Sequence, residues 1–141
     1  MTRIWTVLVL STLASAAVAQ STEQSDTAHL NTSRFQQQIS LTCEFVTECY
    51  DTEACGETQY SVDLVGQASG LEANAMVVSI ELSSAAGTED LVGVIQDKTT
   101  SLSGGTFAAR HFMTIAPEGA ARYSVHYASG PIMISYAGEC R

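Results

Sequence analysis

The stretch Ala109–Tyr127, ARHFMTIAPEGAARYSVHY, contains two runs of alternating apolar and polar residues on either side of a turn. In that turn, Pro117 suits the first central position and Gly119 suits the left-handed position of a three-residue loop. Counting outward from this loop predicts the facing pairs of a β-hairpin. On one side these are Met113 with Tyr123, His111 with Val125 and Ala109 with Tyr127, and on the other Thr114 with Arg122 and Arg110 with His126.

His111 therefore lies on the apolar side of the predicted hairpin. A histidine there is most often a core residue with one hydrogen-bonded ring nitrogen. A buried imidazole can also bind a ligand or transfer a proton, because burial shifts its pKa toward working pH. His111 is accordingly the candidate for catalysis, whereas His126 is expected to lie in solvent beside Arg110.

Short alternating runs separated by Gly, Ser, Asn and Asp clusters cover most of the remaining chain, which is typical of an antiparallel meander. We predict strands at 39–49, 57–65, 75–83, 90–96, 106–115, 121–127 and 132–140, with 98–102 as a candidate eighth strand before a turn at Gly104-Gly105. Residues 66–70 are predicted to form a loop. The expected fold class is all-β, either a small antiparallel β-barrel or a closed β-sandwich.

Bulky side chains dominate the predicted inward faces: Tyr60, Tyr123, Tyr127, Tyr136, Phe45, Phe107, Met76 and Met113. In a small barrel such side chains normally fill the core, and that interpretation is favoured. The alternative is a cavity for a small apolar ligand, since a tyrosine offers both a ring to stack on and a hydroxyl to orient the ligand. The candidate ligand-binding residues are then His111, Tyr123, Tyr127 and Tyr136.

Four cysteines predict two disulfides. Alternation from Ile39 and from Ile132 turns both Cys43 and Cys140 inward, so that a disulfide can join the first strand to the last. Cys49 then pairs with Cys55 across a short polar turn. The close cysteines are five residues apart with no histidine among them, which disfavours a zinc site, and we predict neither a metal nor a cofactor.

Residues 1–19 have the pattern of a cleaved signal peptide. Arg3 provides a cationic start, an apolar run follows over residues 4–13, and Ala17-Val18-Ala19 precedes Gln20. The apolar run is much shorter than the ~20 residues that span a bilayer, so no membrane association is expected after cleavage. Residues 20–34 are predicted to be a flexible polar tail, and residues 35–141 a single domain in the periplasm or outside the cell.

Fifteen acidic residues outnumber six basic ones and give a net charge of −9, which becomes more negative once Arg3 is removed. This charge disfavours a nucleic-acid partner and suits a basic protein. No nucleophile elbow or glycine-rich phosphate loop is present in the sequence. The acidic pair Glu89-Asp90 and the acidic residues of 44–57 are interpreted as a solvated rim, because the alternating ligands of a calcium loop are missing.

Two families of small exported β-proteins share general features with the chain. It is similar to the periplasmic lysozyme inhibitors in size, export, sheet content, the early-to-late disulfide and the segment Tyr136–Cys140. Their Ser-Gly-x-x-Tyr stretch and tryptophan-containing strand are absent. The Gly-x-Trp of lipocalins is also missing, since Trp5 lies in the leader. Neither family supplies a functional residue.

The sequence therefore predicts an exported, soluble, non-catalytic binding protein of the cell envelope, with a small apolar ligand or a basic protein as partner. One alternative is a small hydrolase or isomerase that uses His111. The other is a structural or stress-related envelope protein with no ligand.

Overall fold

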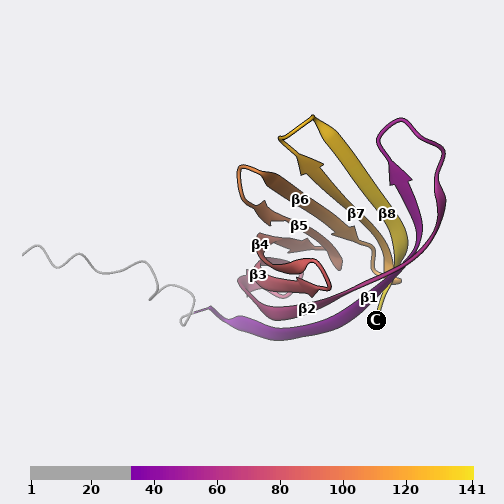
Figure 1. Cartoon of the computed structure of the whole chain (residues 1–141). Helices are drawn as coiled ribbons and strands as arrows, with labels where there is room; N and C mark the ends of the chain where they lie inside the picture. Colours follow the sequence, from indigo (N-terminus) through magenta and orange to yellow (C-terminus); the bar gives the residue numbers. More distant parts are fainter. Residues whose placement is uncertain (1–32) are drawn as a thin grey trace, which may run out of the picture.

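The computed structural model describes residues 33–141, which form a closed antiparallel barrel (Figure 1). Each strand pairs with the next, and the last pairs with the first. The strands are β1 (Phe35–Tyr50), β2 (Gly56–Glu72), β3 (Ala75–Ser84), β4 (Gly87–Gln96), β5 (Thr99–Gly105), β6 (Ala109–Ile115), β7 (Ala120–Tyr127) and β8 (Ile132–Cys140). The all-β meander is confirmed, and it closes as a barrel instead of a sandwich.

The predicted leader, residues 1–19, lies outside the described residues, as do residues 20–32 of the predicted tail. Within residues 33–141, no helix is long and apolar enough to cross a lipid bilayer.

Alternation of burial builds the core. Along β3, every second side chain from Met76 to Leu82 is buried, and the residues between them are exposed. The candidate eighth strand is also confirmed, because β5 places Leu102 in the core between Gly93 of β4 and Met113 of β6. One continuous apolar core therefore runs through the barrel.

β2 is longer than predicted, and the expected loop at residues 66–70 is wrong. These residues continue β2 and pair with both β1 and β3. A Cβ at Gly66 would lie 2.1 Å from the carbonyl oxygen of Ser79, and one at Gly70 would lie 2.4 Å from that of Ala75. The glycines thus leave space for the backbone of β3, and they do not mark a turn.

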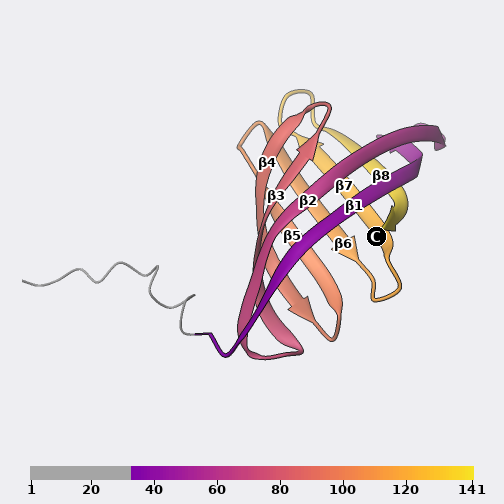
Figure 2. The same cartoon turned by 90° about the horizontal axis from the view of Figure 1, so that it is seen from below.

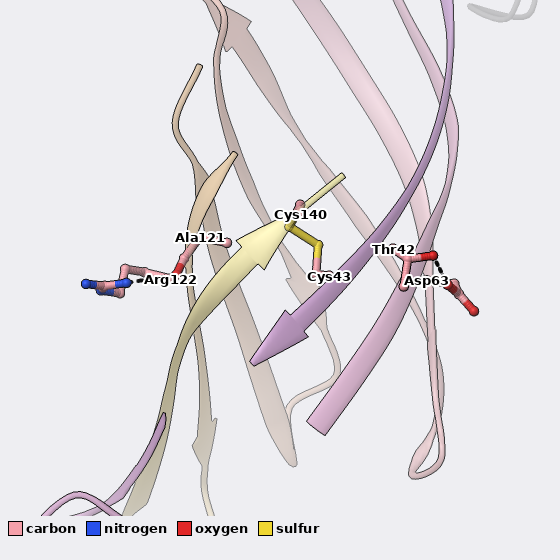
Figure 3. The surroundings of a disulfide bond; sticks show 6 residues. All are labelled: Thr42, Cys43, Asp63, Ala121, Arg122 and Cys140. Atoms are coloured by element: carbon pink, nitrogen blue, oxygen red, sulfur yellow. Dashed lines mark hydrogen bonds between the residues drawn. A yellow bond between two sulfur atoms is a disulfide. The ribbon is translucent and has the colours of Figure 1, made fainter. Parts of the chain in front are cut away.

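Two disulfides fix the first strand, as predicted. Cys43 of β1 lies directly opposite Cys140 of β8, and their disulfide crosses the line where the barrel closes (Figure 3). Thr42 and Arg141 exchange backbone hydrogen bonds beside it, so the cysteines occupy the neighbouring pair, in which side chains come closest. The second disulfide joins Cys49 to Cys55 in the turn between β1 and β2.

The hairpin of β6 and β7 has the predicted register at every position, including His111 opposite Val125 and Arg110 opposite His126. The backbone of Gly119 has a φ of 96°, as the three-residue loop requires. The predicted inward position of Phe107 is wrong, since this side chain is 92% exposed. β5 runs on through Gly105, so the turn falls at residues 106–108 and carries Phe107 into solvent.

The meander places alternate turns at opposite ends of the barrel (Figure 2). We call the end with turns 51–55, 85–86, 106–108 and 128–131 the mouth. The base carries turns 73–74, 97–98 and 116–119, together with the start of β1 and the end of β8.

Candidate functional site

A hollow of about 260 Å³ opens at the mouth of the barrel. Its walls come from six of the eight strands and from the turn between β3 and β4. The lining residues are Tyr60, Leu82, Ser84, Ala86, Gly87, Glu89, Ala109, His111, Tyr123, Val125, Tyr127 and Tyr136. The volume falls just below the ~300 to 1,000 Å³ of ordinary ligand pockets, so the hollow suits a small molecule.

The imidazole of His111 forms part of the inner wall of the hollow and is 8% exposed. Its Nδ1 atom lies 2.6 Å from the hydroxyl oxygen of Tyr123, at hydrogen-bonding distance. Its Nε2 atom has no hydrogen-bond partner, and it is the one buried side-chain nitrogen or oxygen in residues 33–141 with that property. Buried polar groups in folded proteins are nearly always paired, so this atom requires an explanation.

Glycines of β5 make room for this imidazole. Gly104 lies opposite His111 in the sheet. A Cβ on the next residue, Gly105, would lie 2.5 Å from the Cδ2 atom of the ring. Because β5 ends in two residues without side chains, nothing from that strand separates His111 on β6 from the residues of β4.

Glu89 of β4 approaches the unpaired nitrogen. Its Oε1 atom lies 3.9 Å from Nε2 of His111, which is too long for a hydrogen bond. The Glu89 side chain is one-third exposed, and within residues 33–141 no lysine or arginine forms an ion pair with it. A carboxylate without a countercharge therefore borders the hollow.

The charge state of His111 follows from its surroundings. Burial lowers the pKa of His111, the Glu89 carboxylate opposes that shift, and the Arg110 guanidinium adds to it. Burial has the largest effect because an imidazolium loses its hydration in the barrel wall. His111 is accordingly a neutral imidazole at neutral pH.

Three of the tyrosines that line the hollow form a stacked cluster. The ring centroids of Tyr60 and Tyr136 are 4.7 Å apart, and Tyr123 stacks on both. Burial raises the pKa of Tyr123, and the charge of Tyr60 and a hydrogen bond to Tyr60 add to the shift. Burial and the neighbouring Glu48 raise the pKa of Tyr136. These hydroxyls stay protonated and serve as neutral hydrogen-bonding groups.

The structure brings all four predicted ligand-binding residues, His111, Tyr123, Tyr127 and Tyr136, to one hollow. The barrel interior contains both features considered from the sequence, a packed core and, at the mouth, a hollow. Sequence reasoning missed Glu89, which was assigned to a solvated rim. A signal was present, because Glu89 is in phase with the inward residues Leu91 and Ile95 of the same strand.

Larger hollows of about 640 and 770 Å³ lie against the strands elsewhere. The first is lined by Cys49 and by apolar and small polar residues of β5 to β8, and the second by Ser33 and the ends of β2, β3 and β4 at the base. Unlike the hollow at the mouth, neither is lined by His111. The hollow at the mouth is therefore the candidate site.

Within residues 33–141, no group of three or more His, Cys, Asp or Glu side chains is placed to hold a metal ion. Comparison with protein-family models, with curated proteins and with solved structures finds no match to this chain. The two disulfides indicate an oxidising, extracellular or periplasmic environment.

Proposed function

We propose that this chain is an exported, non-catalytic binding protein that takes a small ligand into the mouth of its barrel. The observation that carries this proposal is the buried, unpaired Nε2 atom of His111, a residue that lines the hollow. An unmet buried hydrogen bond costs about 1–3 kcal/mol, and a ligand with one polar group would supply it. The disulfides and the signal-like residues 1–19 support release into the periplasm or the medium.

The hydrolase or isomerase hypothesis has less support. Catalytic histidines that activate a nucleophile are usually oriented by a carboxylate on the opposite ring nitrogen. In residues 33–141, the Nδ1 atom of His111 is held by the Tyr123 hydroxyl, and no serine hydroxyl is hydrogen-bonded to the ring. A basic protein partner agrees with the negative charge of the chain, but that charge does not explain a buried unpaired nitrogen.

The proposal is tested by titrating the purified protein with small neutral, cationic and anionic probes: benzyl alcohol, cyclohexanol, p-cresol, benzylamine and benzoate. Nuclear magnetic resonance of the imidazole nitrogens reports directly on His111, and a His126→Gln variant separates its signals from those of the histidine on the outer face. We expect at least one probe to shift the Nε2 signal of His111 in a saturable manner.

A matched pair of variants locates the binding. Ala109 lines the hollow, whereas its neighbour Ala108 is exposed in the turn. Ala109→Leu fills part of the hollow and should abolish the shift, and Ala108→Leu should leave it intact. Native mass spectrometry of the protein exported by its own leader adds an independent reading, since a retained adduct would identify a natural ligand. Absence of any saturable shift, together with an adduct-free mass, would refute the proposal.

A further inference from the structure

The hydrogen-bonding groups around His111 indicate which chemical group the hollow accepts. The Nδ1 atom of His111 is held at 2.6 Å by the hydroxyl of Tyr123. A hydroxyl can donate its hydrogen to one neighbour and accept a hydrogen bond from another. The Tyr123 hydroxyl can therefore hold Nδ1 in either tautomer of the neutral imidazole.

Nε2 of His111 is an acceptor when the imidazole carries its hydrogen on Nδ1 and donates it to the Tyr123 hydroxyl. An N–H group that enters beside Nε2 selects this tautomer. Nε2 lies 3.9 Å from an oxygen of the Glu89 carboxylate, which is an acceptor in its ionised form. A donor placed between these two atoms therefore meets two acceptors.

A donor with two or more N–H groups satisfies both acceptors at once. An atom at an ordinary hydrogen-bond distance of ~2.8 Å from each fits between groups that are 3.9 Å apart, with an angle of roughly 90° at the bridging atom. Charge favours a cation, because within residues 33–141 no lysine or arginine pairs with Glu89, and the chain as a whole is acidic. Tyrosine rings at the mouth add a surface that attracts cations.

We propose that the hollow binds a small organic ammonium ion, whose N–H groups bridge Nε2 of His111 and the carboxylate of Glu89. Its carbon skeleton lies against the tyrosines at the mouth. This inference rests on the proposed function and narrows it to one ligand class. It also replaces the purely apolar ligand expected from the sequence with an amphipathic cation, and it disfavours fatty acids and other anions.

The test compares three probes of similar shape and different charge: benzylamine, benzyl alcohol and benzoate. Affinities are measured at neutral pH from the shift of the His111 imidazole signals. We expect benzylamine to bind at least about tenfold more tightly than benzyl alcohol, which is the scale of a charge-assisted hydrogen bond, and benzoate not to bind.

Two charge-matched variants identify the carboxylate responsible. Glu89→Gln should remove the preference for benzylamine. Asp90→Asn is the control, because Asp90 is the exposed neighbour on the outer face, and it should change the affinity by less than about twofold. Both variants remove one negative charge, so a difference between them cannot come from net charge.

The outcomes separate this inference from the proposed function. If benzyl alcohol binds as tightly as benzylamine, or if Glu89→Gln keeps the preference, the ammonium assignment is refuted while ligand binding at the mouth stands. If benzylamine causes no saturable shift, the assignment is also refuted, and the proposed function is then decided by the wider probe set and by native mass spectrometry.

Discussion

Removing the disulfide at the barrel closure should cost more stability than removing the one in the turn. The change is the double substitution Cys43→Ala with Cys140→Ala, and its control is Cys49→Ala with Cys55→Ala. The two disulfides are separated in sequence by 97 and 6 residues respectively. In the chain-entropy account, a cross-link stabilises by restricting the unfolded chain, and longer loops are restricted more.

The magnitudes follow from those separations. The relation gives about 4.7 kcal/mol for the long loop and about 2.3 kcal/mol for the short one at 25 °C. Cys43 is fully buried and Cys140 nearly so, whereas Cys55 is exposed. Lost packing therefore widens the expected difference of about 2.4 kcal/mol. For a small domain with a stability of about 5–15 kcal/mol, the closure disulfide is a large fraction of the total.

The assay is equilibrium unfolding in urea, followed by far-ultraviolet circular dichroism for the parent protein and both variants. If the closure variant is unfolded without urea, all three proteins are titrated again in sucrose, which favours the compact state. Equal losses in the two variants, or a larger loss in the turn variant, would refute the entropic reasoning and show that local packing determines what each disulfide contributes.

Three further predictions address the core and the site. In urea titrations at pH 7.5 and 5.5, the parent protein should lose stability as the pH falls through about 6.5, because the histidine takes up a proton in the unfolded chain that buried His111 resists in the folded one. His111→Gln should lose less stability over the same range, and an identical pH dependence in the two proteins would contradict the burial of a neutral imidazole. Gly66→Ala should cost about 1–3 kcal/mol in the same assay, since its Cβ would meet the backbone of β3, whereas Gly56→Ala, with no atom within 4 Å, should change stability by less than about 0.5 kcal/mol. Thermal melting should show a large loss for Phe45→Ala, about 3–5 kcal/mol, and almost none for Phe107→Ala, and similar losses would mean that the inward and outward faces are misassigned.

Most of the fold could be predicted from local patterns. The register of β6 and β7 follows from Pro117 and Gly119 alone, because turn length fixes which residues face each other. The closure disulfide follows from the inward positions that Cys43 and Cys140 occupy in the alternating pattern of their strands. These inferences succeed because side-chain direction in a strand alternates with a period of two, whatever the rest of the fold does.

The positions that failed depend on contacts with distant strands. Gly66 and Gly70 have the composition of a loop, and only the backbone of β3 shows why a strand needs glycine there. Gly104 and Gly105 were assigned to a turn for the same reason, which misplaced Phe107. A glycine signals missing side-chain volume, but the sequence does not say whether a turn or a neighbouring strand uses the space.

The candidate site was predictable in part. The alternation of inward and outward side chains along each strand identifies His111 and the tyrosines of the hollow. The 3.9 Å approach of Glu89 to His111, by contrast, requires β4 and β6 to lie on either side of the end of β5. That approach depends on barrel closure and on the absence of side chains at the end of β5. Neither can be derived from the spacing of residues along the chain.

The position of Arg141 at the base of the barrel has a practical consequence. β1 starts at Phe35, at the base, and Arg141 ends the chain beside Thr42 of β1, while the hollow opens at the opposite end. A tag or linker attached after Arg141 would therefore leave the mouth uncovered. The barrel could be anchored to a sensor chip with its hollow facing the flowing sample, so that weak ligands are screened on protein molecules that all have the same orientation.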